Sequence, residues 1–202
     1  MRLKPPKFIR WLMPDLIWEM KDRSAVYLTF DDGPTPGITE WILSTLDKYD
    51  AKATFFVLGK NVEMYPDLYR RIVEAGHRIG NHTYSHQKGW GMSLERYIED
   101  VDFANDLIHS ELFRPPYARI TPAQARALSQ RYKLVMWDVL SRDYNRALSP
   151  RTCLRNVTRY LEGGSIVVFH DSEKSFRNMS YALPRTLQAV RDMGLKCKAI
   201  DL

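Results

Sequence analysis

The feature that most constrains this chain is a repeated alternation of short β-favouring runs with segments of helical periodicity. The clearest helical pattern spans residues 93–110, where apolar residues recur every three or four positions behind Ser93, a residue type that caps helix N-termini. Strands that alternate with helices predict an α/β fold with a parallel sheet, either open or closed into a barrel. The β-favouring runs lie at residues 25–30, 52–58, 77–81, 112–117, 133–139, 165–170 and 195–200.

The length of the chain predicts a single folded domain. With 202 residues, 45% of them hydrophobic, the chain can bury one sizeable core. We expect this domain to span residues 25–202, with residues 1–24 preceding it or packing on it. The longest apolar runs, at 55–58 and 166–169, are too short to cross a bilayer, so no transmembrane segment is expected.

The first 24 residues do not resemble a signal peptide. Arg10, Pro14 and Asp15 interrupt any apolar stretch and no small-residue cleavage site follows, which by itself predicts a cytoplasmic chain. Packing on the domain is favoured over weak contact of residues 1–20 with a membrane surface, because Pro14 interrupts the helix that such contact needs. The apolar face of that helix would consist of Phe8, Trp11, Leu12, Leu16 and Ile17.

The formal net charge of +6 raises the question of anionic partners. Lys and Arg are scattered along the chain, without the dense basic block or RNA-binding signature of a nucleic-acid site. We therefore expect a solvated basic surface and no nucleic-acid partner. Cys153 and Cys197 are too few and too far apart for a disulfide framework or a Cys-rich metal site, and they leave the redox compartment open.

Polar residues follow the ends of five predicted strands. Because the carboxyl ends of parallel strands meet at one edge of the sheet, where such folds build their active sites, we expect these residues to converge. They are Asp31 and Asp32, His82 and His86, Arg114 to Tyr117, Asp143, and His170 with Asp171.

The stretch NHTYSH, residues 81–86, is a candidate metal site. Histidines at positions i and i+4 lie on one face if the backbone takes a helical turn, so that both imidazoles can reach one ion. One carboxylate of the Asp31–Asp32 pair can supply a third ligand. Two histidines and one carboxylate leave coordination positions free for water and substrate, as a catalytic site requires.

The stretch LTFDDGP, residues 28–34, places two like charges where a buried strand meets a loop. Successive side chains of a strand point to opposite faces, so the two aspartates share a pocket only if the chain turns at Gly33–Pro34. One carboxylate then binds the ion, which offsets the repulsion, while the other stays free as a base for water.

The ordered motifs TFDDGP, HTYSH, RPPY, RDY and FHD resemble those of the carbohydrate esterase family 4 polysaccharide deacetylases, whose domain is also called the NodB homology domain. The resemblance covers roughly residues 24–200, and its first two motifs are highly specific together. It implies a distorted, incomplete (β/α) barrel, which agrees with the seven β-favouring runs. It also implies removal of N-acetyl groups from N-acetylglucosamine-type polymers such as peptidoglycan, chitin and chitooligosaccharides, usually with zinc.

The resemblance also implies a role for each matching residue. Asp31 is expected to be the general base, and Arg114 to pair with it. The resemblance gives His170 as the general acid that protonates the departing amine, with Asp143 favouring its charged form. The backbone N–H of Tyr117 is expected to help hold the oxyanion. The implied metal ligands are Asp32, His82 and His86.

Four positions depart from the family pattern. Ala118 stands where glycine is common after RPPY, and Tyr144 stands where tryptophan is common. Val168 replaces a leucine, and Leu140 replaces an aspartate often found earlier in the fourth motif. None of these four changes removes a ligand, base or acid, but they affect the expected shape of the acetyl pocket.

Three functions remain open at this point. The first is a metal-dependent deacetylase of N-acetylated glycans, which would be extracytoplasmic substrates of the cell envelope. The second is another metal-dependent amidase or esterase on the same scaffold, since a fold and a metal triad do not dictate the substrate. The third is a non-catalytic sugar-binding module, which an intact set of base, acid and ligands disfavours. The ligand set also suits Fe²⁺, Co²⁺ and Ni²⁺, so the expectation of zinc rests on the resemblance.

Overall fold

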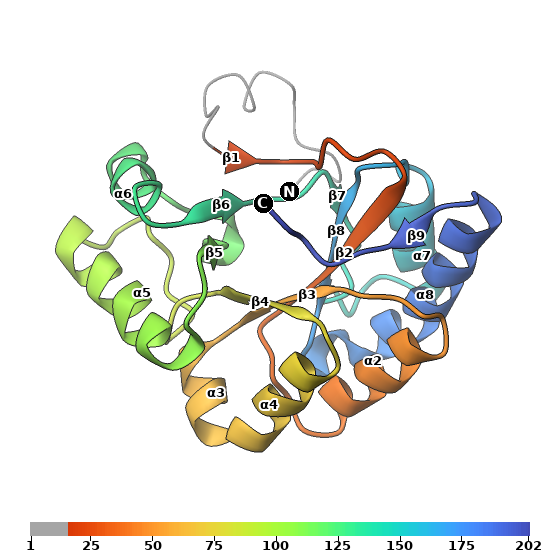
Figure 1. Ribbon diagram of the computed structural model, residues 1–202, viewed down its shortest axis with the longest axis horizontal. Coiled ribbons are helices and arrows are strands. Elements are labelled where there is room, and N and C mark those ends of the chain that lie inside the picture. The colour runs from red at the N-terminus through yellow and green to blue at the C-terminus, as the bar shows by residue number, and fades with distance from the viewer. Residues whose placement is uncertain (1–15) are drawn as a thin grey trace.

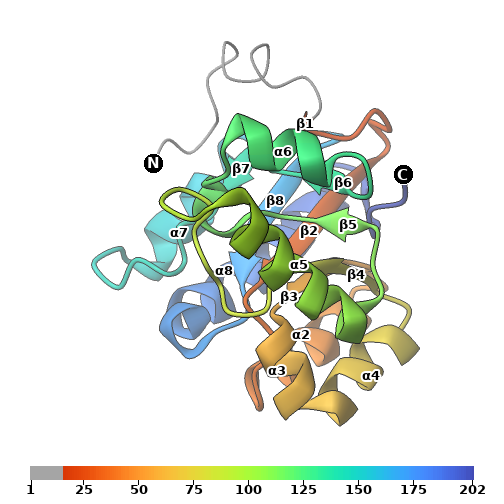
Figure 2. The ribbon, with the colours of Figure 1, turned by 90° about the vertical axis from the view of Figure 1, so that its left-hand side faces the viewer.

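The computed structural model describes residues 16–202, which form a curled sheet with helices around its outer face (Figures 1 and 2). The strands are β1 (Leu16–Ile17), β2 (Ala25–Asp31), β3 (Thr54–Val57), β4 (Arg78–Asn81), β5 (Leu112–Phe113), β6 (Lys133–Val135), β7 (Val139–Leu140), β8 (Ile166–His170) and β9 (Lys196–Cys197).

The sheet is an incomplete barrel. Its strands follow the order β1-β6-β5-β4-β3-β2-β8-β7, every neighbouring pair is parallel, and β9 adds a further parallel pairing to β2. Within the described part of the chain, β1 and β7 end the order and do not pair with each other. The predicted distorted, incomplete barrel is confirmed, although residues 16–202 contribute nine strands where the sequence indicated about seven.

The helices connect the strands on the outside of this barrel (Figure 1). Helix α5 confirms the helix expected at residues 93–110, and its N-cap Ser93 accepts a hydrogen bond from the backbone N–H of Arg96 at 3.3 Å. The α-helices are α2 (Ile38–Asp47), α3 (Gly59–Met64), α4 (Pro66–Glu74), α5 (Leu94–Ile108), α6 (Pro122–Leu128), α7 (Pro150–Thr158) and α8 (Glu173–Asp192), and a 3₁₀ turn, η1, spans Pro116–Ala118.

Two predicted strands are corrected by the structure. The run 133–139 forms two strands, β6 and β7, which pair with different neighbours. Between them the buried carboxylate of Asp138 accepts the backbone N–H of Ile166 at 2.7 Å and so takes a donor that a continuous ladder would use. The run 112–117 forms a paired strand only at β5, because Pro115 and Pro116 have no N–H to donate to a neighbouring strand.

The N-terminal segment also differs from its expected form where it is described. Leu16 and Ile17 form β1 and pair with Leu134 and Val135, so they do not lie on a helical apolar face. Phe8, Trp11 and Leu12, with the rest of residues 1–15, lie outside the described residues. Among residues 16–202, no helix is long and apolar enough to span a membrane.

Strand β2 is buried on both faces, and the alternation of its side chains decides which residues point toward the candidate site. Leu28 and Phe30 pack in the hydrophobic cluster that also contains residues of α2 and α8. Thr29 and Asp31 therefore point to the opposite, interior face, where both contact Arg114. The strict alternation of a strand thus delivers Asp31 to the inside of the barrel.

The turn after β5 carries local backbone strain. Tyr117 and Ala118 have φ values of 59° and 55°, in the left-handed region that costs an L-residue about 1–2 kcal/mol. Ala118 is the position at which the family commonly has glycine, and a glycine takes this backbone conformation without that cost.

We predict that Ala118→Gly stabilises the protein by about 0.5–1 kcal/mol, since relief of strain exceeds the added chain entropy of glycine. The free energy of unfolding from chemical denaturation measures the change. As a control, Ala189→Gly within α8 should destabilise by about 1 kcal/mol. A loss of stability at both positions would contradict the strain argument.

Candidate metal centre and active site

A cavity of about 380 Å³ opens at the carboxyl ends of the strands. Eight of the residues predicted for the site line it, while Arg114 and Asp143 lie behind it and are fully buried. The lining residues are Asp31, Asp32, His82, His86, Tyr117, Arg119, Trp137, Leu140, Tyr144, Val168, His170, Ser172 and Lys174. The convergence expected from the strand ends is therefore present.

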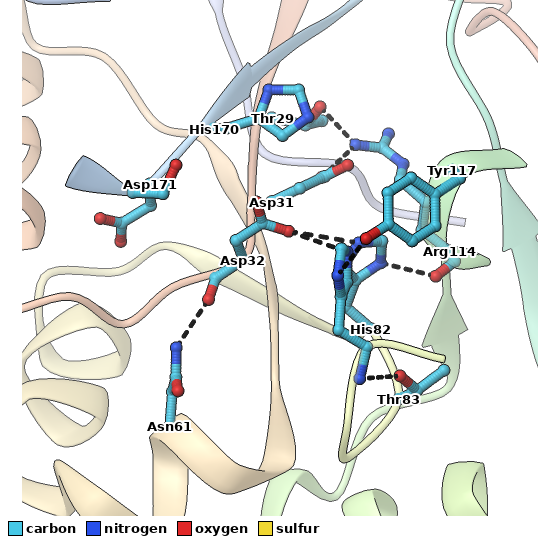
Figure 3. Close-up of polar contacts among 12 residues, drawn as sticks. Thr29, Asp31, Asp32, Asn61, His82, Thr83, Arg114, Tyr117, His170 and Asp171 are labelled. Carbon is cyan, nitrogen blue, oxygen red and sulfur yellow. Dashed lines mark hydrogen bonds and ion pairs between the residues drawn. The ribbon is translucent and has the colours of Figure 1, made fainter. Parts of the chain in front are cut away.

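Asp32, His82 and His86 form a group that fits a metal ion. One potential ligand atom from each lies within 4.8 Å of the other two. The Oδ1 oxygen of Asp32 is 3.2 Å from Nε2 of His86 and 3.7 Å from Nε2 of His82 (Figure 3). This oxygen is buried and accepts no hydrogen bond from the described residues, so a cation would supply its missing partner.

The protonation of His82 supports this assignment. Its Nδ1 lies 2.7 Å from the carbonyl oxygen of Arg114, which can only accept, so Nδ1 carries the proton and donates. Burial lowers the pKa of His82 to about 4, which keeps the imidazole neutral near pH 7. Nε2 of His82 therefore presents a lone pair toward Asp32. The pairing of a ligand histidine with a backbone carbonyl is a common support for metal binding.

His86 has a hydrogen-bonding neighbour, and Asp32 is ionised. The Nδ1 atom of His86 lies 3.2 Å from the hydroxyl of Tyr117. Burial alone would raise the pKa of Asp32, but the contact with His86 and the charge of His170 hold it well below its ordinary value. Asp32 is thus a carboxylate beside neutral His82, which is the charge state that a divalent cation needs.

The two histidines meet through a loop and not through the helical turn considered in the sequence analysis. Residues 82–86 contain no helix, and Thr83 and His86 take positive φ values of 69° and 61°. The hydroxyl of Thr83 accepts the backbone N–H of His86 at 3.0 Å (Figure 3). The side chain of Asn81 accepts the backbone N–H of Thr83 at 2.8 Å. These local side-chain bonds fold the loop tightly enough to bring both rings to Asp32.

Asp31 and Asp32 reach the same cavity by different backbone routes. Asp31 is the last residue of β2, whereas Asp32 has a φ of 81°, which turns the chain immediately after the strand. The side-chain amide of Asn61 donates to the carbonyl oxygen of Asp32 at 2.8 Å and fixes this turn (Figure 3). The turn therefore occurs at Asp32 itself, one residue earlier than the Gly33–Pro34 pair.

Arg114 holds Asp31 in place across the barrel interior. Its guanidinium donates to Oδ1 of Asp31 and to Oγ1 of Thr29, each at 2.7 Å (Figure 3). It also donates to the carbonyl oxygens of Val135 and Met136, at 3.1 and 2.8 Å, and lies 4.0 Å above the ring of Phe56. Four hydrogen bonds, one of which is also the ion pair with Asp31, satisfy this buried cation.

His170 and Asp143 form a second ion pair, in which Asp143 is fully buried and His170 is partly buried. Nδ1 of His170 donates to Oδ1 of Asp143 at 2.7 Å, and the backbone N–H of His170 donates to Oδ2 at the same distance. Burial would lower the pKa of His170, but the charge and hydrogen bond of Asp143 raise it to about 9. His170 is therefore an imidazolium at neutral pH, in contrast to His82.

Several functional positions were missed by the sequence analysis. Trp137 falls within the run 133–139 that was expected to form one strand, yet it lies between β6 and β7 and lines the cavity while remaining buried. Thr29 supports Arg114, and its spacing of two residues from Asp31 along a strand was a usable signal. Arg119, Ser172 and Lys174 also line the cavity, and only their nearness to predicted motifs pointed to them.

Asp171 stands apart from the ligand group, although it is adjacent to His170. Its carboxyl is buried and accepts a hydrogen bond from Thr39 at 2.5 Å, directed away from Asp32 (Figure 3). Burial raises its pKa to about 7. We therefore assign Asp171 to the anchoring of α2 and exclude it from the candidate metal ligands.

Known proteins share this fold and these motifs. A peptidoglycan-N-acetylglucosamine deacetylase of Bacillus cereus is 36% identical over 158 residues, which cover 75% of this chain and 57% of that protein. The peptidoglycan-N-acetylmuramic acid deacetylase PdaC of Bacillus subtilis is 30% identical over 186 residues, which cover 89% of this chain and 38% of that protein. The chain thus matches only 57% and 38% of the length of these two relatives.

A solved structure agrees with the sequence relatives. The structure of a peptidoglycan N-acetylglucosamine deacetylase in complex with 4-naphthalen-1-yl-N-oxidanyl-benzamide is 29% identical, with a TM-score of 0.85, and the match covers 95% of this chain and 94% of that chain. The family model described as polysaccharide deacetylase matches residues 19–137, more than half of the sequence. Together with the motif order and the barrel, these matches show that the chain belongs to the polysaccharide deacetylase family of carbohydrate esterase family 4.

Proposed function

We propose that this protein is a metal-dependent hydrolase that removes N-acetyl groups from an N-acetylglucosamine-type glycan of the peptidoglycan or chitooligosaccharide class. The observation that carries the proposal is the combination, in one cavity, of an Asp-His-His ligand group, an arginine-held carboxylate and an imidazolium. The names of the relatives support N-acetylated cell-wall glycans as the substrate class.

Asp32, His82 and His86 would hold the ion. When bound, a divalent ion supplies Lewis acidity, which polarises a carbonyl oxygen and acidifies a water molecule. We propose Zn²⁺ because two imidazoles and one carboxylate with open positions form a typical catalytic zinc set. Co²⁺, Ni²⁺ and Fe²⁺ remain chemically compatible with the same donors.

The other residues would carry the proton transfers. Asp31, held in place by Arg114, accepts a proton from the attacking water as the oxygen of that water bonds to the acetamide carbon. His170 then gives its proton to the nitrogen as the carbon–nitrogen bond breaks, which leaves acetate and a free amine. Asp143 keeps His170 charged until that step.

Tyr117 has two proposed roles at this site. Its hydroxyl contacts His86, and nothing among the described residues accepts a hydrogen bond from its backbone N–H. That free donor supports its assignment to the developing oxyanion. Leu140, Tyr144 and Val168 line the rest of the cavity, and we propose that they shape the acetyl pocket.

The leading alternative is a metal-dependent esterase or amidase that acts on another acylated molecule, because the same groups would also hydrolyse an ester. Acetate release from N-acetylglucosamine oligosaccharides, compared with release from a simple aryl acetate, separates the two. A chain that hydrolyses only the aryl acetate would favour the alternative.

We predict that the purified protein binds one divalent ion per chain and loses hydrolysis after chelation, since activation of water depends on the ion. Metal analysis by mass spectrometry and acetate release measure the two quantities. Re-addition of Zn²⁺ should restore activity. Full activity in metal-free protein would contradict the mechanism.

Replacement of Asp31 or Asp32 by asparagine should impair hydrolysis in two different ways. Asp32→Asn weakens a ligand, so metal content should fall on dialysis and excess ion should partly restore activity. Asp31→Asn leaves the ligands intact, so the ion should stay while turnover drops by about 10² to 10⁴, without rescue by metal. Circular dichroism checks that Asp31→Asn, which uncovers the charge of Arg114, remains folded. The reverse pattern of metal loss would exchange the two roles.

Asp143→Asn should shift the pH dependence of hydrolysis without changing metal content. His170 must be protonated to act as the acid, so activity falls as the pH rises through its pKa, which is about 9. Loss of the carboxylate charge lowers this pKa and should move the alkaline limb of the pH–rate profile down by about one to two pH units. An unmoved limb with reduced activity would mean that Asp143 does not tune His170.

A further inference from the structure

Three exposed cations surround the mouth of the catalytic cavity, each over an aromatic ring. The Nζ atom of Lys88 lies 5.5 Å from the centroid of Tyr117, and that of Lys174 lies 5.9 Å from the centroid of Tyr144. Both tyrosines line the cavity, so the two lysines mark different parts of its rim. The rings hold the ammonium groups near the opening by cation–π attraction.

Arg119 extends this rim beyond the cavity. Its side chain lines the cavity, and its guanidinium lies 5.4 Å from the ring centroid of Trp90, which is 58% exposed. The indole N–H of Trp90 donates to the carbonyl oxygen of Ile120 at 3.1 Å, which fixes the ring beside Arg119. A cation and an exposed aromatic face thus lie together on the path that leads out of the site.

The charge of the rim is not neutralised locally. Across residues 16–202, no carboxylate lies within 4.0 Å of the charged groups of Lys88, Arg119 or Lys174. The only acidic residues that line the described cavity are Asp31 and Asp32, which have their own cationic or metal-binding partners. An anion at the mouth would therefore meet unpaired positive charge.

The size of the cavity determines what reaches this rim. A volume of about 380 Å³ is near the lower end for ligand cavities, so it encloses one N-acetylated sugar and little more. The neighbouring sugars of a longer chain, with any substituents, must then lie over the mouth. Their charge is what Lys88, Arg119 and Lys174 would contact.

We propose that Lys88, Arg119 and Lys174 form a cationic rim that selects glycans with a carboxylate on the sugar next to the one that is deacetylated. This inference rests on the proposed deacetylase function and names the substrate class within it. In a cell-wall glycan, the carboxylate belongs either to a lactyl ether on the neighbouring sugar or to a peptide attached through that lactyl group.

The test compares acidic glycans with their neutral counterparts. The substrates are peptide-free cell-wall glycan strands with lactyl carboxylates, the same strands with attached peptides, and amidated forms of both in which the carboxylates are neutral. A neutral N-acetylglucosamine tetrasaccharide reports deacetylase activity by itself. The value of kcat/KM for acetate release is measured for each substrate.

We expect the wild-type protein to prefer each acidic glycan over its amidated form at low ionic strength. Replacement of one rim cation by alanine should reduce this ratio by about 2- to 5-fold, as for an exposed ion pair, and Lys174→Arg should retain it. The triple variant of Lys88, Arg119 and Lys174 should bring the ratio close to one. Raising the salt concentration should shrink the wild-type ratio in the same direction.

A second triple variant controls for net charge. Alanine at Lys48, Arg126 and Arg159, which are exposed and do not line the cavity, removes the same three charges and should leave the acidic-to-amidated ratio unchanged. Preference for the lactyl form alone, or only for the peptide-bearing form, identifies which carboxylate the rim contacts.

The possible failures are distinguishable. Equal kcat/KM for acidic and amidated glycans in the wild type would overturn the cationic rim while leaving the deacetylase function intact. A ratio lowered equally by both triple variants would also overturn it, because the effect would then be one of net charge. Absence of acetate release from every glycan, the tetrasaccharide included, would instead overturn the proposed function.

Discussion

The buried guanidinium of Arg114 is the interaction on which the rest of the site depends. It joins Thr29 and Asp31 on β2 to the carbonyl oxygens of Val135 and Met136, although β2 is separated from β5 and β6 in the strand order by β3 and β4. Burial disfavours its charge, and Asp31 offsets that cost. The backbone carbonyl of Arg114 also fixes the tautomer of His82. Arg114 therefore positions both the candidate base, Asp31, and a candidate metal ligand, His82.

His82 and His170, which both line the cavity, show how the environment decides the chemistry of one residue type. His82 is buried, and burial lowers its pKa to about 4, while the carbonyl oxygen of Arg114 keeps the single ring proton on Nδ1. His170 faces the carboxylate of Asp143, and its pKa rises to about 9. At neutral pH the first therefore offers a lone pair to a cation and the second offers a proton to a leaving group. Environments that separate pKa values in this way are typical of acid–base sites.

Local sequence patterns determined the fold class and indicated which residues form the candidate site. Alternating β-favouring and helical runs predicted an α/β fold with a parallel sheet, because strand and helix periodicity are properties of short segments, and the family resemblance added the incomplete barrel. The position of a polar residue directly after such a run also placed it at the carboxyl edge of the sheet. Asp31, Asp32, His82, His86 and His170 were found for this reason, and all five line one cavity.

Only the tertiary structure decided how those residues act on one another. The division of residues 133–139 into two strands depends on the carboxylate of Asp138 binding Ile166, a partner 28 residues away. Other features likewise depend on contacts between distant segments. They are the tight loop that joins His82 and His86, the position of Trp137 as a buried residue that also lines the cavity, and the hydrogen bond of Arg114 to Asp31 across the barrel interior. The sequence by itself determined which side chains stand at strand ends, since periodicity is local. The structure decided their partners, protonation and orientation, because those follow from burial and hydrogen bonds that form only when the barrel curls.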